Sequence, residues 1–396
     1  MSGLLDEGVT RNILVDAIHE APVACVLELA GAGTQVLGWL HGVSGSSSTV
    51  LEAHDRYHFD SMAEVLGERP ERSTDPTVAD ALAAAAFKRA RELSGDGVAV
   101  IGLGCTAALV TNRSRRGAHV CHVTTYDGLG SCQLTVNLTK GARVRGQEEQ
   151  VAASLVLFAL AISTGVDWRV IPQWPSPEQV SIDLDASPDL VHLLSGSTQV
   201  ILRSIDGRVL VDSLTMHRSE AGALLSGSFN PLHDGHHGLA AAASEYLGME
   251  VAYELPVLNA DKLPLSVMTT HRRAGQFLGR ANLWLTRAAL YTEKARLFPG
   301  TVFVVGADTA CRVLQPRFYG GKSQMIAAVE AICDAGCRFL VAARSISDGL
   351  LTLKKINVPE RFKSSFIELP AEKFCLDRSS TEIRAALTTG TAWSIL

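Results

Sequence analysis

Short apolar runs alternate with amphipathic segments along the second half of this chain. The runs are rich in aliphatic and β-branched residues and predict strands, and the segments between them have the periodicity of helices. The expected strands are Ala223–Leu225, Glu250–Leu255, Leu283–Thr286, Thr301–Val305, Phe339–Ala343 and Phe366–Leu369, and the expected helices include Val267–Leu278, Arg287–Leu297 and Ser323–Ala335. Because such alternation is typical of βαβ units, we predict a doubly wound parallel sheet that binds ligands beyond the carboxyl ends of its strands.

The first half of the chain also mixes strands and helices. Strands are expected at Val23–Leu29, Val98–Leu103, Ala118–Thr124 and Cys132–Leu138, and helices at Thr77–Leu93 and Gln147–Ile162. A segment rich in proline, serine and aspartate, Ile171–Pro188, predicts a connector, and Asp206-Gly207 between two β-rich runs predicts a hairpin. We therefore predict an α/β domain over residues 1–168, a linker with a hairpin over 169–219, and a second α/β domain over 220–396.

Composition narrows the class of partner. The 396 residues carry a formal net charge of −5 and no basic run, so we expect no nucleic-acid partner. The longest apolar run, Val151–Ile162, is shorter than the roughly 20 residues of a membrane span, so we expect a core helix and no membrane partner. The first ten residues, MSGLLDEGVT, have no basic region typical of a leader, and the cysteines form no CxxC pair. We expect a soluble cytoplasmic protein with reduced thiols and no zinc site.

The ten residues 227–236, GSFNPLHDGH, carry the strongest chemical indication in the sequence. They follow an expected strand and precede a helical stretch, so a strand should end in a loop that opens a helix. Backbone N–H groups and the positive end of a helix dipole then converge on one point, which suits a phosphate. His233 and His236 would lie where that anion binds, and Gly227 and Gly235 would let the backbone approach it. The alternative is that the two histidines only cap the helix.

A second element, SSTEIR, lies near the C-terminus and is also expected to open a helix. Ser379 and Glu382 have the spacing of a capping box, while the hydroxyls of the motif and Arg384 could form a second phosphate site. The two roles are compatible. Between the two motifs, a buried strand ends in Gly306 and Asp308, a position typical of either a ligand contact or a helix cap. Lys262 follows another strand end and is either a phosphate ligand or a solvated lysine.

These motifs, in this order, resemble those of the HIGH-type nucleotidyltransferase superfamily, and most closely the nicotinamide-mononucleotide adenylyltransferase branch. The resemblance implies a Rossmann-like domain that transfers an adenylyl group from ATP to a mononucleotide such as nicotinamide or nicotinate mononucleotide, a reaction of NAD biosynthesis. It implies Mg²⁺ carried by the triphosphate of the ATP co-substrate, with no protein metal site. It assigns catalysis to His233, His236 and Arg384, and nucleotide binding to Gly227, Ser228, Phe229, Asn230, Gly235, Lys262, Gly306, Asp308, Ser379, Ser380 and Thr381.

Two other functions stay open at this point. Cytidylyl- and phosphopantetheine-type transferases share the first motif, so neither the acceptor nor the choice between ATP and CTP follows from the sequence. A pseudoenzyme that binds nucleotides and acts as an assembly module is the alternative from another functional class. In each case the expected partners are small-molecule nucleotides.

The first half resembles the C-terminal domain of the CinA family, whose active members deamidate nicotinamide mononucleotide. Residues 28–33, ELAGAG, stand where that family has ESCTGG, so Leu29 takes the place of the nucleophilic serine. Tyr57 and Gly67 match a second family segment, in which Met62 replaces a lysine. The glycine-rich loop of the family becomes residues 102–107, where Cys105 is expected to be a small buried side chain. The resemblance implies a domain without deamidase activity, for which three roles stay open: binding a nucleotide, pairing subunits into a homo-oligomer, or stiffening the fold.

Overall fold

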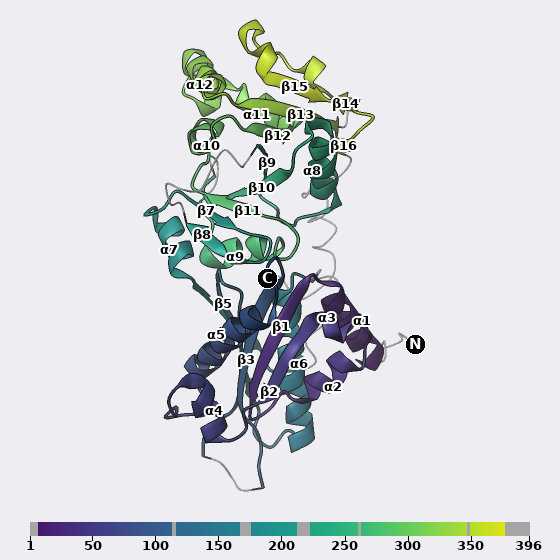
Figure 1. Cartoon of the computed structure of the whole chain (residues 1–396), viewed down its shortest axis with the longest axis vertical. Helices are drawn as coiled ribbons and strands as arrows, with labels where there is room; N and C mark the ends of the chain where they lie inside the picture. Colours follow the sequence, from purple (N-terminus) through teal and green to yellow (C-terminus); the bar gives the residue numbers. More distant parts are fainter. Residues whose placement is uncertain are drawn as a thin grey trace. The chain divides into compact units, whose positions relative to one another are not determined.

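A computed structural model describes residues 7–112, 116–166, 176–211, 222–259, 263–346 and 349–376 (Figure 1). The chain is mixed α/β and divides into two compact units. The first unit comprises Met1–Leu190 with Ser204–Val209 and Gly275–Arg280, and the second comprises Val191–Arg203, Leu210–Ala274 and Ala281–Leu396. In the described ranges, no helix is long and apolar enough to cross a membrane. The predicted domain boundaries stay predictions.

The first unit is built on a six-stranded sheet of order β2-β1-β3-β4-β5-β6. The strands β2, β1 and β3 run parallel, and the pairs β3–β4, β4–β5 and β5–β6 are antiparallel. Every residue of β1 and β3 is buried, as expected for strands that are covered on both faces. The strand bounds are β1 Val23–Ala30, β2 Val50–Asp55, β3 Ala99–Ala108, β4 His119–Tyr126, β5 Gly130–Leu138 and β6 Val180–Ala186.

The longest helices of this unit are α5, Pro76–Leu93, and α6, Arg145–Ser163, and α6 contains the long apolar run as a buried helix. Gly102 and Gly104 lie inside β3 and not in a loop, which corrects the comparison with a glycine-rich loop. A Cβ atom on Gly102 would lie 2.1 Å from the carbonyl oxygen of Ala83, so glycine is needed for α5 to approach the strand. The other helices are α1 Glu7–Glu20, α2 Gln35–His41, α3 Ser46–Thr49 and α4 Phe59–Leu66.

The second unit contains most of a ten-stranded sheet of order β14-β13-β12-β9-β10-β11-β7-β8, in which β15 and β16 also pair with β13. The strands β15, β13, β12, β9, β10 and β11 are parallel, and β7 joins β11 antiparallel. All six strands predicted in this half are present, with ends shifted by at most three residues. The bounds are β7 Val200–Arg203, β8 Val209–Val211, β9 Ala223–Ser226, β10 Val251–Pro256, β11 Leu283–Thr286, β12 Val302–Gly306, β13 Arg338–Ile346, β14 Gly349–Leu351, β15 Phe366–Leu369 and β16 Cys375–Leu376.

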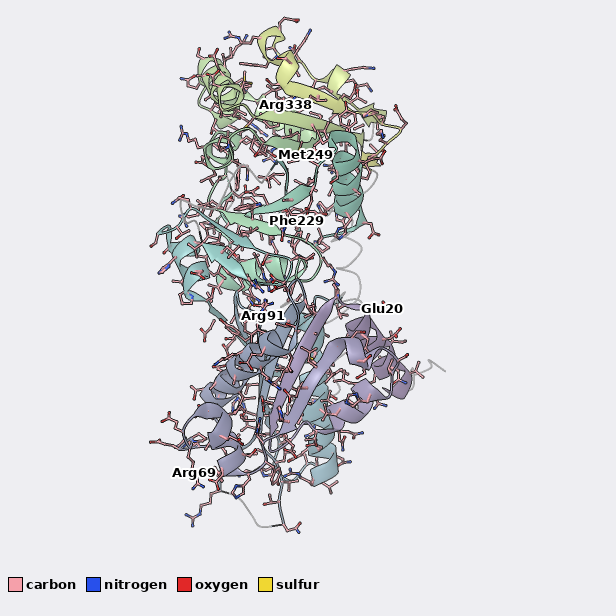
Figure 2. All side chains as sticks on the ribbon, in the orientation of Figure 1. Glu20, Arg69, Arg91, Phe229, Met249 and Arg338 are labelled. Atoms are coloured by element: carbon pink, nitrogen blue, oxygen red, sulfur yellow. The ribbon has the colours of Figure 1, made fainter. Side chains whose placement is uncertain are left out.

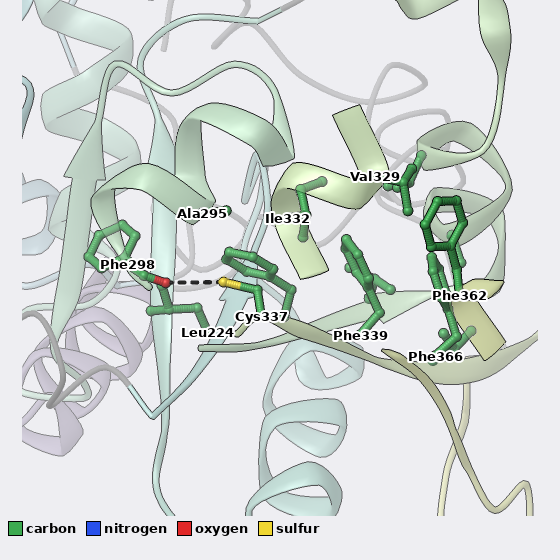
Figure 3. Close-up of a cluster of buried hydrophobic side chains, with 14 of the residues drawn as sticks. Leu224, Ala295, Phe298, Val329, Ile332, Cys337, Phe339, Phe362 and Phe366 are labelled. Carbon is green, nitrogen blue, oxygen red and sulfur yellow. Dashed lines mark hydrogen bonds between the residues drawn. The ribbon is translucent and has the colours of Figure 1, made fainter. Parts of the chain in front are cut away.

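An aromatic core packs one face of this sheet. The rings of Phe339 and Phe366 stack at 4.8 Å between centroids, and the Cys337 thiol donates to the carbonyl of Phe298 at 3.4 Å (Figure 3). The burial of these side chains provides the hydrophobic free energy that holds the helices on the strands. The helix bounds are α7 Pro188–Ser195, α8 Asp234–Leu247, α9 Val267–Gly275, α10 Tyr291–Leu297, α11 Ala307–Val313 and α12 Lys322–Asp334, with short 3₁₀ turns at Pro316–Phe318, Leu353–Lys355 and Glu360–Ser365.

Two segments lie between the halves: an expected connector, which contains a strand, and an expected hairpin, which is present. The expected connector contains β6, which pairs antiparallel with β5 and forms an edge of the first sheet. Its side chains alternate between intermediate and exposed, and this is why its composition resembles that of a loop. The hairpin at Asp206-Gly207 is confirmed, since β7 pairs with β8 and Gly207 N donates to Ser204 O at 2.8 Å.

Candidate functional site

A buried aromatic side chain, Phe229, fixes the loop that joins β9 to α8. Phe229 is fully buried, and its ring packs edge-on against His236 and Tyr253 at centroid distances of 5.1 and 5.7 Å. A Cβ atom on Gly227 would lie 2.7 Å from that ring, so the first glycine of the motif is required for packing. Figure 2 labels Phe229 within the second unit. The predicted binding residue Phe229 therefore supports the loop from inside.

The two histidines of the motif cap α8 in a reciprocal way. Nδ1 of His233 accepts a hydrogen bond from the backbone N–H of Gly235 at 3.1 Å, and Nδ1 of His236 accepts one from the backbone N–H of His233 at 3.3 Å. The two rings lie 3.9 Å apart between centroids. Because each Nδ1 is an acceptor, we assign the hydrogen of each neutral ring to Nε2. Capping therefore turns both imidazoles into Nε2–H donors.

Burial keeps both histidines uncharged. It lowers the pKa of His233, although the nearby Asp234 carboxylate opposes this shift. Burial, together with the neighbouring His233 and His237, lowers the pKa of His236 to about 3. At neutral pH the pair can donate two hydrogen bonds from a partly desolvated position. Such donors are effective when they face a site where negative charge develops.

The predicted strand end at Gly306 and Asp308 lies at the same edge of the sheet as the histidine loop. The strands β9 and β12 are parallel neighbours, with Leu225 opposite Val304, so the chain leaves both strands side by side. Gly306 is the N-cap of α11, and Asp308 lies in its first turn, where a carboxylate is favoured by the helix dipole. The Asp308 carboxylate also accepts a charged hydrogen bond of 2.6 Å from Arg344 on β13.

The side of the loop nearer β10 contacts two arginines that the sequence analysis missed. Arg273, on the last turn of α9, donates to the carbonyl of Ser228 at 3.0 Å, and Arg272 donates to Oδ1 of Asn230 at 3.4 Å. These contacts fix Ser228 and Asn230, both predicted binding residues, against a helix that follows β10. The available signal was the pair of adjacent arginines within an expected helix, Val267–Leu278.

A buried ion pair lies behind the loop and was also missed. Nζ of Lys294 is 2.7 Å from both carboxylate oxygens of Glu254, and the hydroxyl of Thr286 donates to one of them. Glu254 is fully buried and Lys294 is 3% exposed. The backbone carbonyl of Glu254 also accepts a 3.0 Å hydrogen bond from the N–H of Gly227. The ion pair therefore holds Glu254 in place, and the backbone of Glu254 in turn holds Gly227, the first residue of the loop.

The structure brings together nine of the predicted site residues on the β9 and β12 strand ends: Gly227, Ser228, Phe229, Asn230, His233, Gly235, His236, Gly306 and Asp308. The other five predicted residues, Lys262, Ser379, Ser380, Thr381 and Arg384, lie outside the described residues. Across the ranges that the structure describes, no group of three or more His, Cys, Asp or Glu side chains has a geometry that could hold a metal ion.

In the first unit, the positions compared with the serine and the lysine of the CinA family hold buried apolar side chains. Leu29 is fully buried and Met62 is 3% exposed. Glu28 is also buried, and its carboxylate is held by Arg56 at 2.7 Å and by His54 at 3.0 Å. Cys105 is fully buried, and its pKa is raised by the neighbouring Cys121 thiol and by burial, so its thiol stays protonated.

Part of the chain is similar in structure to two solved proteins. No protein-family model and no curated protein matches the sequence. The competence/damage-inducible protein CihA from Agrobacterium tumefaciens is similar in structure over 40% of this chain and 94% of its own, with 17% identity and a TM-score of 0.31. A competence-damaged (CinA) superfamily protein from Escherichia coli covers 40% of this chain and 91% of its own, with 15% identity and a TM-score of 0.29. These neighbours are CinA-superfamily proteins.

Replacing Lys294 by methionine is expected to destabilise the second unit strongly. The substitution leaves the Glu254 carboxylate buried without its cation, and we expect the free energy of unfolding to fall by about 3–5 kcal/mol. Urea denaturation followed by fluorescence measures this loss. The double variant Glu254→Gln/Lys294→Met removes both charges and should recover most of the stability. A single variant as stable as the wild type would contradict a structural role for the pair.

The low pKa of His236 predicts a loss of stability in acid. The unfolded chain binds a proton at this residue below about pH 6.5, whereas the folded chain does so only near pH 3. The free energy of unfolding should therefore fall below pH 6.5, by up to about 1.4 kcal/mol per pH unit from this group. Urea titrations between pH 7 and pH 5 measure the slope. His236→Asn, which keeps an acceptor for the cap, should flatten it, and an unchanged slope in this variant would refute the assignment.

Proposed function

We propose that this protein is a nucleotidyltransferase that transfers an adenylyl group from ATP to a mononucleotide and releases pyrophosphate. Nicotinamide or nicotinate mononucleotide is the proposed acceptor, as the resemblance of the motifs implies. The observation that carries the proposal is the reciprocal capping of His233 and His236, in which each Nδ1 accepts a backbone hydrogen bond and the hydrogen of each neutral ring is therefore on Nε2, at the amino end of α8. This is the position that a reacting phosphate favours.

The order of the parallel strands supports a Rossmann-like second domain. Numbered along the chain from β9, the parallel strands have the order 3-2-1-4-5-6, which is the order of dinucleotide-binding folds. The strand order reverses between β9 and β12, where the chain leaves the sheet in opposite directions. Ligands of such sheets bind at this point, and the histidine loop and Gly306 both lie there. We propose that the doubly wound fold and the transferase site belong together.

In the proposed reaction, an oxygen of the acceptor phosphate attacks the α-phosphorus of ATP. A new P–O–P bond forms, the bond between the α- and β-phosphates breaks, and pyrophosphate leaves with its electron pair. The Nε2–H groups of His233 and His236 would donate to the α-phosphate oxygens, on which charge increases. Mg²⁺ bound to the triphosphate would neutralise the leaving group. We place that ion on the triphosphate because the nearby Asp308 carboxylate is held by Arg344.

Mutation of the two histidines tests the proposal. We expect His233→Ala and His236→Ala each to reduce turnover by about 10²–10³-fold, because each removes one oriented donor. Pyrophosphate release is measured with ATP and CTP against nicotinamide mononucleotide, nicotinate mononucleotide and phosphopantetheine. His237→Ala is the matched control on the same helical turn and should stay near the wild-type rate. The absence of release from the wild type with every pair would favour the pseudoenzyme, and wild-type rates in both variants would reject the site.

We further propose that the first unit is a CinA-like domain without deamidase activity. Its nucleophile position holds Leu29, its lysine position holds Met62, and the Cys105 thiol is protonated and buried. Incubation of the full chain with nicotinamide mononucleotide should release no ammonia above the background rate. Ammonia release that Cys105→Ser abolishes would contradict this proposal.

A further inference from the structure

We propose that Arg272 on α9 binds the phosphate of the acceptor, so that the acceptor must be a phosphate monoester. This inference rests on the proposed function and assigns a residue to the second substrate of the same site. It places the acceptor on the β10 side of the histidine loop, and the triphosphate on the β12 side.

The geometry brings the guanidinium of Arg272 to the loop from the β10 side. The helix α9 follows β10 in the chain, and its last turn carries Arg272 and Arg273. Arg273 donates to the Ser228 carbonyl at 3.0 Å, which fixes the end of the helix against the loop. Arg272 reaches Asn230 at 3.4 Å, three residues before the capping histidine His233. A group bound at Arg272 would therefore lie beside the histidines.

Among the described residues, Arg272 has no matching carboxylate. On the β12 side, the charge of Arg344 is matched by Asp308 at 2.6 Å. Within the described part of the chain, Arg272 forms no ion pair, and its contact is a long hydrogen bond to a neutral amide oxygen. Partial desolvation lowers the pKa of Arg272, and no neighbouring charge adds to this shift. A partly desolvated cation with spare donors attracts an anion.

The proposed chemistry requires such a cation on the acceptor side. The attacking atom is a phosphate oxygen, so two anionic groups must approach each other before the new bond forms. A guanidinium can hold two oxygens of one phosphate in parallel hydrogen bonds, which leaves the third oxygen to attack. An acceptor that attacked through an alcohol would have no use for this cation. The side of the loop that Arg272 occupies therefore selects for a terminal phosphate.

The test compares Arg272→Gln with a control arginine. Glutamine keeps a donor for Asn230 but removes the charge and the fork, and Arg296→Ala removes an exposed arginine from α10. Binding of nicotinate mononucleotide to the full chain is measured by calorimetry without ATP, with nicotinic acid riboside as the ligand that lacks the phosphate. We expect Arg272→Gln to weaken mononucleotide binding about 10–100-fold. Riboside binding and the Arg296→Ala variant should be unchanged.

Kinetics separate this inference from the proposed function. Arg272→Gln should raise KM for the acceptor and leave KM for ATP near the wild-type value, and Arg272→Lys should restore part of the loss. A raised KM for ATP alone, or unchanged mononucleotide binding, would overturn the inference. Failure of the wild type to bind any phosphate monoester would overturn it as well. If mononucleotide binding depends on Arg272 but no pyrophosphate is released, the role of Arg272 in phosphate binding is supported and the transferase proposal fails.

Discussion

The site of the second unit depends on a buried carboxylate that is held by a lysine. Glu254 lies on β10, Lys294 on α10 and Thr286 at the end of β11, so one set of hydrogen bonds joins three elements. Taking both charges out of water has a large cost, and the pair is tolerable because the carboxylate has three donor contacts. What the ion pair contributes is the position of the backbone around Glu254. The backbone of Glu254 receives the N–H of Gly227, so the pair fixes the point at which the loop leaves the sheet.

From that point, packing determines where the catalytic candidates lie. The Phe229 side chain is buried beneath its own loop, and its ring packs edge-on against both His236 and Tyr253. The chain then reaches His233, and the two histidines satisfy N–H groups of the first turn of α8, which have no partner within the helix. Capping and the proposed function are thus compatible, because the bonds that cap the helix occupy Nδ1 of each ring and keep the ring hydrogen on Nε2.

The sequence predicted the features that depend on local pattern. The strands of the second half follow from their apolar runs, and the loop and helix start at GSFNPLHDGH follow from glycine, proline and the capping positions. The ion pair could not be predicted in this way, because Glu254 and Lys294 are 40 residues apart and meet only in the folded chain. The close approach of α5 to Gly102 has the same origin, since it depends on an alanine face of a helix elsewhere in the sequence. Arg272 was missed because its relation to Asn230 also depends on the tertiary fold.

The two units differ in how they use the ends of their parallel strands, and this difference bears on where chemistry can occur. In the first unit, the Glu28 carboxylate near the end of β1 is paired with Arg56 and His54, and the adjacent Leu29 is fully buried in the core. A Cβ atom on Gly33, beyond the same strand, would lie 3.1 Å from Val156, so the turn is filled by its own side chains. In the second unit, the strand ends present helix N–H groups, imidazole donors and a guanidinium. In the first arrangement the carboxylate charge is compensated within the protein, whereas the second places neutral imidazoles and an arginine without a matching carboxylate at one loop, which is the arrangement on which the proposed anion site rests.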